Sequence, residues 1–299
     1  MTDTDNALVA KHLVDKRRRR RALEQTVSPL PHTTRVITVS NQKGGVGKTT
    51  TTVNLASALA RRGANVLVID LDPQGNASTA LGVMHRPEVT SVYDVLLGDE
   101  DIEAAIQPTT DHERLFCVPS TINLAGAEIE LVSLVAREQR LRTALESFLS
   151  ESETHFHYVF IDCPPSLGLL TVNAFVAASE VLIPIQCEYY ALEGLSQLLS
   201  NIKLIQKHLN PGLRVSTILL TMYDARTNLA QEVAQEVRTH FPTETLTAVV
   251  PRSVRISEAP SYGQTVHAYD AGSIGAIAYL EAAAEIAQRG TDPLTSEGA

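Results

Sequence analysis

The amino-acid sequence predicts an α/β protein with a doubly wound, mainly parallel sheet and helices on both of its faces. From Arg35 onward, short β-branched and apolar runs alternate with longer segments of helical periodicity, which is typical of a parallel sheet covered on both sides. The chain of 299 residues, with 44% hydrophobic and 20% charged residues, is long enough for one large domain with a sizeable core. Its apolar runs all stay below the ~18 residues that a membrane span needs.

The first predicted unit is a strand at residues 35–40, followed by a glycine-rich loop and a helix over residues 50–62. Gly63 follows the last helical residue, a position where glycine commonly ends a helix. A second buried strand is predicted at residues 64–70, and residues 86–113 are expected to be less regular, with short helices between Pro and Gly residues. Later strands are expected at residues 114–118, 158–162, 181–185, 215–220 and 245–250, and the longest helices near residues 192–208 and 271–288.

The two ends of the chain differ in composition from the domain predicted at residues 35–290. Residues 1–34 are predicted to be a basic, flexible extension, because they carry seven Lys and Arg against four Asp and Glu and end in S-P-L-P. Their run K-R-R-R-R-R, Lys16–Arg21, is either a solvated tail or a grip on phosphate backbones, and a short helix over residues 8–21 is compatible with the pattern. Residues 291–299 are predicted to be a polar tail.

Net charge and cysteine usage narrow the possible functions. The formal net charge is −9, which speaks against indiscriminate nucleic-acid binding, so any contact of the domain with DNA must use a local patch. Cys117, Cys163 and Cys187 lie far apart and form no C-x-x-C pair. This usage indicates a reducing cytoplasm and argues against a zinc or iron–sulfur site within one chain.

The loop after the first strand has the features of a phosphate-binding loop. Gly44, Gly45 and Gly47 let backbone N–H groups turn toward a ligand, and the following helix adds the positive end of its dipole. Lys48 can reach the β- and γ-phosphate oxygens of a nucleotide, and Thr49 can bind Mg²⁺. Because a buried strand precedes the loop and a helix follows it, nucleotide binding is favoured over a glycine-rich turn with chance lysines.

The same loop departs from the strict P-loop pattern. That pattern requires a glycine at position 42, where this chain has Gln42, and a second lysine, Lys43, stands beside it. Taken alone, Lys43 could be an exposed surface lysine without a role in the loop.

Two further motifs place carboxylates at the ends of predicted strands. V-F-I-D-C-P-P ends an apolar run in Asp162, where P-loop proteins hold the acid that orients the magnesium shell. D-L-D-P-Q-G-N places Asp70, Asp72 and Gln74 after the second strand, where they could position or polarise an attacking water. The alternative for this motif is an Asx or Pro turn that closes the strand, but the phosphate-binding loop upstream favours catalysis.

Six motifs along the chain can be compared with those of known families. They are K-G-G-V-G-K-T-T, D-L-D-P-Q-G-N, I-D-C-P-P-S-L-G, Q-C-E-Y-Y-A-L-E-G-L, T-M-Y-D-A-R-T-N-L and P-R-S-V-R-I-S-E-A-P-S-Y-G-Q. Together they resemble the motifs of the ParA/Soj-type partition ATPases, a P-loop family with a deviant Walker A motif. The likeness covers about Arg35 to Gln288. The first three motifs are shared with the wider group, including MinD-like proteins, and the last three point more narrowly to ParA.

The resemblance implies a slow, Mg²⁺-dependent ATPase that forms a homodimer on binding ATP. The dimer would bind double-stranded DNA without sequence preference, on the nucleoid in the cytoplasm, and would not attach to a membrane. A ParB-like centromere-binding partner would release it by stimulating hydrolysis. The implied catalytic residues are Lys43, Lys48, Asp72 and Asp162, and the implied metal ligands are Thr49, Asp72 and Asp162. The implied nucleotide contacts are Lys43, Gly44, Gly45, Val46, Gly47, Lys48, Thr49, Thr50, Met222 and Pro251, and the implied DNA contacts are Arg226 and Arg255.

The same resemblance gives the second lysine of the loop a specific role. Lys43 would be the signature lysine that reaches the phosphates of the ATP held by the other subunit. Two neighbouring lysines repel each other in an empty site, and a γ-phosphate between two subunits supplies the missing negative charge. For Arg226 and Arg255, the alternative is a surface or salt-bridged arginine, with Glu258 as a possible partner.

Two other functions are known on this scaffold. A MinD-like membrane switch needs an amphipathic C-terminal helix with basic and bulky apolar faces, whereas this chain ends in G-T-D-P-L-T-S-E-G-A. A metabolic enzyme would be a dethiobiotin-synthetase-like ligase or a nitrogenase-reductase-like electron carrier, and the carrier needs two cysteines that face a shared cluster. The extension at residues 1–34 is too short for a helix-turn-helix domain, so binding to a specific operator is not expected.

Overall fold

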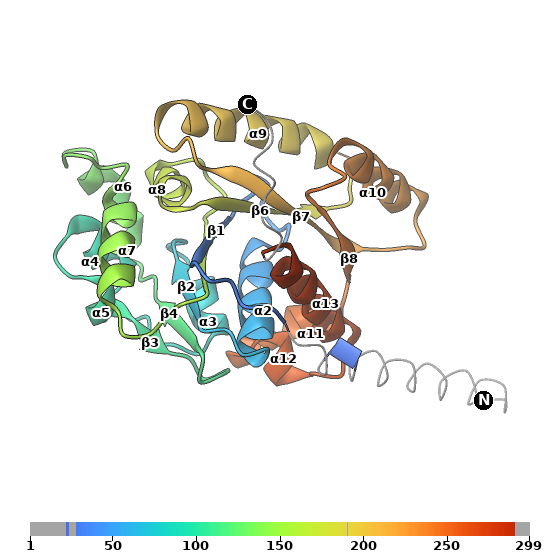
Figure 1. Ribbon diagram of the computed structural model, residues 1–299, viewed down its shortest axis with the longest axis horizontal. Helices are drawn as coiled ribbons and strands as arrows, with labels where there is room; N and C mark the ends of the chain where they lie inside the picture. The colour runs from blue at the N-terminus through green and yellow to red at the C-terminus, as the bar shows by residue number, and fades with distance from the viewer. Residues whose placement is uncertain (1–21, 24–27, 190, 291–299) are drawn as a thin grey trace.

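An eight-stranded sheet forms the centre of the protein, with helices on both of its faces (Figure 1). The computed structural model describes residues 22–23, 28–189 and 191–290. The strand order is β3-β4-β2-β5-β1-β6-β7-β8, and all neighbouring strands are parallel except β3 and β4, which are antiparallel. The doubly wound, mainly parallel sheet predicted from the sequence is therefore confirmed.

The elements have the following bounds. The strands are β1 Arg35–Val39, β2 Val66–Asp70, β3 Gln107–Pro108, β4 Leu115–Val118, β5 Tyr158–Asp162, β6 Glu180–Gln186, β7 Arg214–Tyr223 and β8 Thr245–Pro251. The longer helices are α2 Lys48–Arg61, α6 Leu124–Leu131, α7 Arg140–Glu151, α8 Leu169–Ala177, α9 Ala191–His208, α10 Asn228–His240 and α13 Ile274–Arg289. The short ones are α3 Asn76–Ala80, α4 Val92–Leu97, α5 Ile102–Ala105, α11 Val254–Glu258, the 3₁₀ helix η1 Ala259–Tyr262 and α12 Val266–Tyr269.

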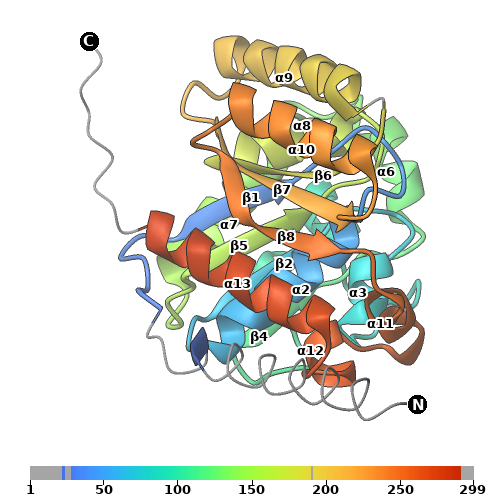
Figure 2. The same cartoon turned by 90° about the vertical axis from the view of Figure 1, so that its right-hand side faces the viewer.

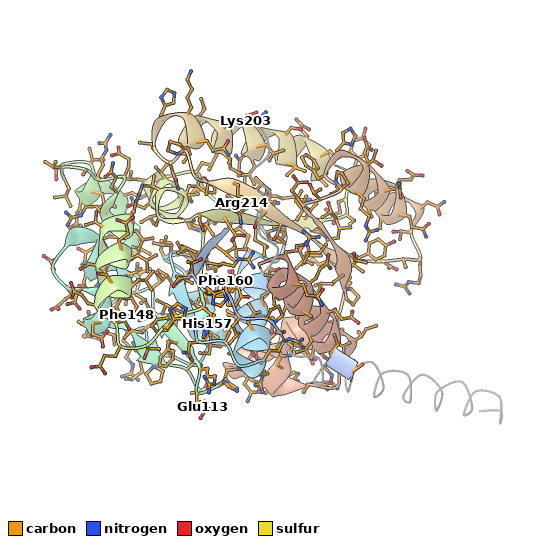
Figure 3. All side chains as sticks on the ribbon, viewed as in Figure 1. Glu113, Phe148, His157, Phe160, Lys203 and Arg214 are labelled. Atoms are coloured by element: carbon orange, nitrogen blue, oxygen red, sulfur yellow. The ribbon has the colours of Figure 1, made fainter. Side chains whose placement is uncertain are left out.

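Two layers of helices enclose the sheet. Helices α2 and α13 pack side by side on one face, and α7, α8, α9 and α10 cover the other (Figures 1 and 2). In β5, Tyr158 and Phe160 join the apolar cluster under α2 and α13, while Val159 and Ile161 join the cluster under α7 and α8. Phe160 lies in the interior in Figure 3. All five residues of β5 are buried, and a parallel strand that is covered on both faces is expected to be a continuous apolar run.

The structure adds detail that the sequence pattern did not contain. All of the strands predicted from the sequence are present, but β3 was missed, because two residues at a sheet edge leave no periodic signal. Helix α2 begins at Lys48, earlier than the predicted start at residue 50. The short helices α4 and α5 lie in the segment predicted to be irregular. Among the helices of the described residues, none is long and apolar enough to cross a membrane.

Part of the N-terminal extension packs on the domain. Leu23 contacts the core cluster, and its carbonyl oxygen accepts a hydrogen bond from Arg62 Nη1 at 2.6 Å. Arg62 also donates to the hydroxyl of the buried Ser28. The basic run at residues 16–21, the helix considered over residues 8–21 and the polar tail at residues 291–299 lie outside the described residues. The division into an extension, a domain and a tail stays a prediction.

Candidate active site

The strand order brings the predicted acidic residues beside the glycine-rich loop. Strand β5 lies between β1 and β2, and Val39, Asp162 and Asp70 are in register at the carboxyl ends of these three strands. The glycine-rich loop leaves β1 at this point, and Asp72 follows the end of β2. Segments that are far apart in the sequence therefore meet at one edge of the sheet, where ligands of open α/β sheets usually bind.

The loop between β1 and α2 has a backbone shape that its glycines permit. Gly45 and Gly47 have φ angles of 75° and 88°, in the left-handed region where a residue with a Cβ is strained. A Cβ added at Gly44 or Gly45 would meet nothing within 4 Å, so this side of the loop is open. Gly47 is the N-cap residue of α2 and no side chain of the described residues caps it, so the first N–H groups of the helix remain available to an anion.

Two side chains outside the glycine motif anchor the loop. Thr221 Oγ1, near the end of β7, donates a hydrogen bond to the carbonyl oxygen of Val46 at 2.9 Å. Asn41 Nδ2 donates to the carbonyl oxygen of Pro184 at 2.8 Å, and Asn41 Oδ1 accepts from Lys43 N at 3.0 Å. Neither Thr221 nor Asn41 could be assigned from the sequence, because their bonds to Val46 and Pro184 depend on strands that become neighbours only in the folded sheet.

Lys48 is buried in the first turn of α2, beneath the loop. Burial lowers the pKa of its ammonium group, and the negative charge of Asp162 only partly offsets this effect. A partly desolvated cation next to free backbone N–H groups gains stability when an anion arrives. This arrangement fits the phosphate-binding role predicted for Lys48.

Asp162 has one carboxylate oxygen that is paired and one that is not. Its Oδ1 accepts a hydrogen bond from Thr52 Oγ1 at 2.9 Å, whereas Oδ2 is buried and has no hydrogen-bond partner among the described residues. Burial, together with the charge of Asp70, raises the pKa of Asp162 to about 8, although the nearby hydroxyls of Thr49 and Thr52 favour the charged form. A buried, unpaired carboxylate oxygen beside a threonine hydroxyl fits a site for Mg²⁺ and its water shell.

The two acids after β2 differ in their surroundings. Asp70 Oδ2 accepts hydrogen bonds from Ser78 N at 2.8 Å and Ser78 Oγ at 2.7 Å, and burial raises the pKa of Asp70 to about 6. Asp72 is also buried, and its Oδ1 accepts from Gln74 N at 3.0 Å, which closes an Asx turn. Asp70 therefore organises the start of α3, while Asp72 lies in the turn that follows β2.

Lys43 stands at the mouth of the loop, where its side chain is 41% exposed. Its Nζ lies 2.7 Å from Oε2 of Glu188, which follows the end of β6. An ion pair between exposed side chains is worth ~0–1 kcal/mol, so Glu188 holds Lys43 only weakly. A stronger anion can therefore draw Lys43 away at small cost.

The comparisons with known proteins agree with this geometry. Residues 34–215 match the family described as an AAA domain. The sporulation initiation inhibitor protein Soj of Bacillus subtilis is 52% identical over 86% of this chain and 99% of its own length. The chromosome partitioning protein ParA of Myxococcus xanthus is 49% identical over 86% of this chain and 89% of its own. The chain belongs to the ParA/Soj family.

One similar solved structure contains a bound ATP analog and magnesium. It is described as cobyrinic acid a,c-diamide synthase from Mycobacterium smegmatis with bound ATP analog and magnesium. That structure is 40% identical in sequence, has a TM-score of 0.70, and the match covers 84% of this chain and 93% of the other. The recognition of a ParA/Soj-type P-loop protein from its motifs is thus confirmed.

Met222 and Pro251 are the two residues that the ParA/Soj resemblance places near an adenine. Met222 lies near the end of β7 with a φ of 49°, and its Cε is 3.9 Å from the position of a Cβ built on Gly47. Pro251 ends β8 and is in register with Tyr223. Both residues therefore lie at the same edge as the loop. Their contact with a base stays a prediction, as does that of Thr50 in the first turn of α2.

The two arginines expected to bind DNA are already paired with carboxylates. Arg226 donates to both oxygens of Asp224, at 2.8 and 2.7 Å, and its side chain is 89% exposed. Arg255 lies 3.1 Å from Glu258 and 3.5 Å from Asp270, so the salt bridge to Glu258 that the sequence suggested is present. DNA phosphates would have to replace these surface carboxylates, which hold the arginines weakly.

A third arginine of this ParA/Soj chain, Arg252, lies beside the loop that carries Arg226. Arg252 is exposed at the end of β8, and its N–H donates to the carbonyl oxygen of Tyr223 at 3.4 Å. Hydrogen bonds from Arg226, assisted by the charge of Arg252, lower the pKa of Asp224 to about 2. The sequence contains Arg252 in the quoted P-R-S-V-R motif, but only the pairing of β7 with β8 shows that it lies beside the Asp224–Arg226 loop.

Proposed function

We propose that the protein is an ATP-dependent DNA-segregation switch. In this proposal, ATP joins two copies into a dimer, the dimer binds duplex DNA without sequence preference, and hydrolysis releases it. The observation that carries the proposal is one loop with two lysines in different settings: Lys48 is buried beneath the loop, and Lys43 is exposed at its mouth. A nucleotide bound by one copy needs only the buried Lys48, so the exposed Lys43 can contact a nucleotide that is bound by a second copy.

The residues of one copy would hold ATP as follows. The backbone N–H groups of residues 44–49 would surround the β-phosphate, and Lys48 would neutralise the β- and γ-phosphate oxygens. Thr49 and Asp162 would hold Mg²⁺, directly or through water, and the bound ion would neutralise charge that develops on the phosphates. Asp72 would orient the attacking water with its carboxylate, as the ParA/Soj resemblance implies.

The second copy would complete the site. Lys43 would leave Glu188 and contact the phosphates held by the partner, since a triphosphate between two subunits is a stronger acceptor than an exposed carboxylate. Loss of the γ-phosphate would remove that contact and weaken the dimer. The dimer would therefore persist until the bound ATP is hydrolysed.

DNA binding would follow from pairing the two copies. Arg226 and Arg255, with Arg252 beside them, would exchange their carboxylate partners for phosphates of the duplex. Each copy offers few contacts and the chain is acidic, but a dimer doubles the contacts, so affinity would rise steeply on dimerisation. A ParB-like, centromere-bound protein is the partner proposed to stimulate hydrolysis.

A second candidate is a ligase that uses ATP on a small molecule. It draws support from the M. smegmatis structure, which is described as a diamide synthase. The two candidates differ in what stimulates hydrolysis: DNA with a partner protein in the first case, and a small carboxylic acid with an amine donor in the second. An electron-carrier role gains no support from the cysteines, because Cys117, Cys163 and Cys187 are all buried.

The decisive experiment compares nucleotide states. Size-exclusion chromatography and retention on plain duplex DNA are measured with ADP and with a nonhydrolysable ATP analogue, both with Mg²⁺. The proposal expects a dimer and DNA retention with the analogue only. A protein that stays monomeric and does not bind DNA when saturated with the analogue would contradict it. Sedimentation with anionic lipid vesicles separates it from the MinD-like alternative.

A further inference from the structure

A groove lies between α5 and α7 and contains none of the residues of the candidate active site. Its volume is about 940 Å³, and it follows α7 to Glu151 and continues to Thr154. Figure 1 shows α4 and α5 beside α7 at the left of the view. Residues 152–154 lead into β5, so this end of the groove lies at the edge of the sheet where the strands begin, opposite the glycine-rich loop.

The groove has an apolar floor and acidic walls. Val95 and Phe148 lie at the floor, where both are buried. The walls carry five exposed carboxylates: Glu100, Asp101, Glu103, Glu151 and Glu153. In the described part of the chain, none of the five forms a salt bridge with a lysine or an arginine. We refer to this site as the acidic groove.

An arginine in the lining does not neutralise these carboxylates. Arg140 Nε donates a hydrogen bond to the carbonyl oxygen of Leu96 at 2.8 Å, and Arg140 Nη2 donates to that of Leu97. Its guanidinium is therefore turned toward the end of α4. A concave surface lined by one sign of charge concentrates the electrostatic potential, so the groove attracts cations and repels phosphates. Its apolar floor favours a chain segment that combines basic with apolar side chains.

The N-terminal extension of the same chain contains such a segment. Residues 16–21 are K-R-R-R-R-R, and Leu13 and Val14 precede them closely. The basic run lies outside the described residues, but the residue that attaches it to the domain, Leu23, is described. The carbonyl oxygen of Leu23 accepts a hydrogen bond from Arg62.

The attachment point lies at the same edge of the sheet as one end of the acidic groove. Asn65 comes three residues after Arg62, and its Nδ2 donates to the carbonyl oxygen of His155 at 3.0 Å. His155 directly follows Thr154, which lines the groove. An extended chain spans about 3.3 Å per residue, so a run of six residues covers about 20 Å. The extension is therefore long enough to lead from Leu23 into the groove.

We propose that the acidic groove binds the basic run at residues 16–21 of the same chain, and that this binding withholds the run from DNA. The inference does not rest on the proposed function, because it needs neither nucleotide nor a second copy. A short tether gives the run a local concentration on the order of millimolar, so even a weak attraction fills the groove. Arginines that face these carboxylates are not available to the phosphates of a duplex.

Other occupants would have to reach the groove without this tether. The basic run of a second copy carries the same charges, but its local concentration is set only by the concentration of the protein. A basic segment of another protein would also have to compete with the tethered run. The tests below therefore separate binding within one chain from binding between chains.

The first test compares two variants that each lose three exposed carboxylates. The groove variant combines Glu100→Gln, Glu103→Gln and Glu153→Gln. The control variant combines Glu113→Gln, Glu232→Gln and Glu236→Gln, which lie outside the groove, with Glu113 at the lower edge of the view in Figure 3. Limited trypsin digestion of the full chain, without nucleotide and at low salt, measures the rate of cleavage within residues 16–21 by mass spectrometry.

The basic run should be protected from trypsin when it occupies the groove. Cleavage in the groove variant is expected to be at least tenfold faster than in the control variant, which should match the unmodified protein. Equal rates in the three proteins would overturn the proposal. Far-ultraviolet circular dichroism checks that both variants are folded.

Cross-linking tests the unmodified protein and so does not depend on the variants. A carbodiimide joins a lysine amine to a carboxylate that it contacts, and Lys16 is expected to be linked to glutamates of the acidic groove. An equal mixture of unlabelled and heavy-nitrogen-labelled protein should give links within one isotope only. Links that mix the isotopes would show that a second copy fills the groove, and an absence of links to the groove would show that the run lies elsewhere. Either result overturns the proposal.

Retention on duplex DNA tests the consequence for DNA binding. Without nucleotide, the groove variant is expected to be retained at least threefold more strongly than the control variant, which has the same net charge. Equal retention of the two variants would overturn the part of the proposal that concerns DNA.

Discussion

Replacing Asp162 by Asn should stabilise the nucleotide-free protein, and the gain should grow with pH. Burial and the charge of Asp70 raise the pKa of Asp162 from 3.8 to about 8. Between these values the folded protein holds a proton that the unfolded chain has lost, so the contribution of this carboxylate to stability falls as pH rises. One proton corresponds to about 1.4 kcal/mol per pH unit. From pH 6 to pH 8, the advantage of the Asn variant should therefore increase by about 2 to 3 kcal/mol.

Urea unfolding followed by circular dichroism measures this difference, in EDTA and without nucleotide, at pH 6, 7 and 8. Asn retains an oxygen that can accept the hydrogen bond from Thr52, so packing changes little. Asp224→Asn is the control, because the pKa of Asp224 is about 2 and its carboxylate does not titrate in this range. An Asp162→Asn advantage that is equal at pH 6 and pH 8 would show that the carboxylate is ionised throughout, and the reasoning would be wrong.

Four further substitutions test other parts of the account. Lys48→Ala removes the buried ammonium and should abolish ATP binding in equilibrium dialysis; retained binding would contradict the phosphate role. Asp72→Ala should bind ATP, dimerise and stay on DNA without hydrolysis, and a variant unable to dimerise would contradict the catalytic role. Arg226→Glu should weaken DNA retention with ATPase activity intact, and added salt should have the same effect on the unmodified protein. Glu180→Gln leaves the guanidinium of Arg35 buried without its carboxylate and should lower the free energy of unfolding by about 3 kcal/mol; a loss below about 1 kcal/mol would count against this pair.

The main residues of the candidate site could be predicted from the sequence, because each of them belongs to a short local motif. The glycines, Lys48 and the strand that ends in Asp162 lie within short motifs whose pattern predicts strand, loop and helix. The free oxygen of Asp162 could not be predicted, because it depends on the hydrogen bond from Thr52, which belongs to a different element. The ParA/Soj resemblance distinguished Asp72 from Asp70, but the position of the two acids after the strand did not. Only the contact with Ser78 shows that Asp70 organises the start of α3.

Contacts between distant segments account for the rest of the difference. The pair Lys43–Glu188 joins loops that follow two different strands, and Thr221 within β7 bonds to Val46 in the loop after β1. No periodicity or spacing in the sequence connects these residues. Strand β3 was missed because only two of its residues pair with β4. The packing of Leu23 on the domain could not be predicted, because the charged run that dominates the composition of the N-terminus indicated a flexible extension.

The position of β1 in the sheet has a consequence for synthesis on the ribosome. Both neighbours of β1, the strands β5 and β6, come from residues 158–162 and 180–186, so the first strand made has no pairing partner until more than half of the chain has emerged. Until then the glycine-rich loop lacks the neighbouring Asp162 and the hydrogen bonds that join Asn41 to Pro184 and Thr221 to Val46. A nascent chain of this protein therefore gains the ability to capture nucleotide late in translation, and that ability reports that the centre of the sheet has assembled.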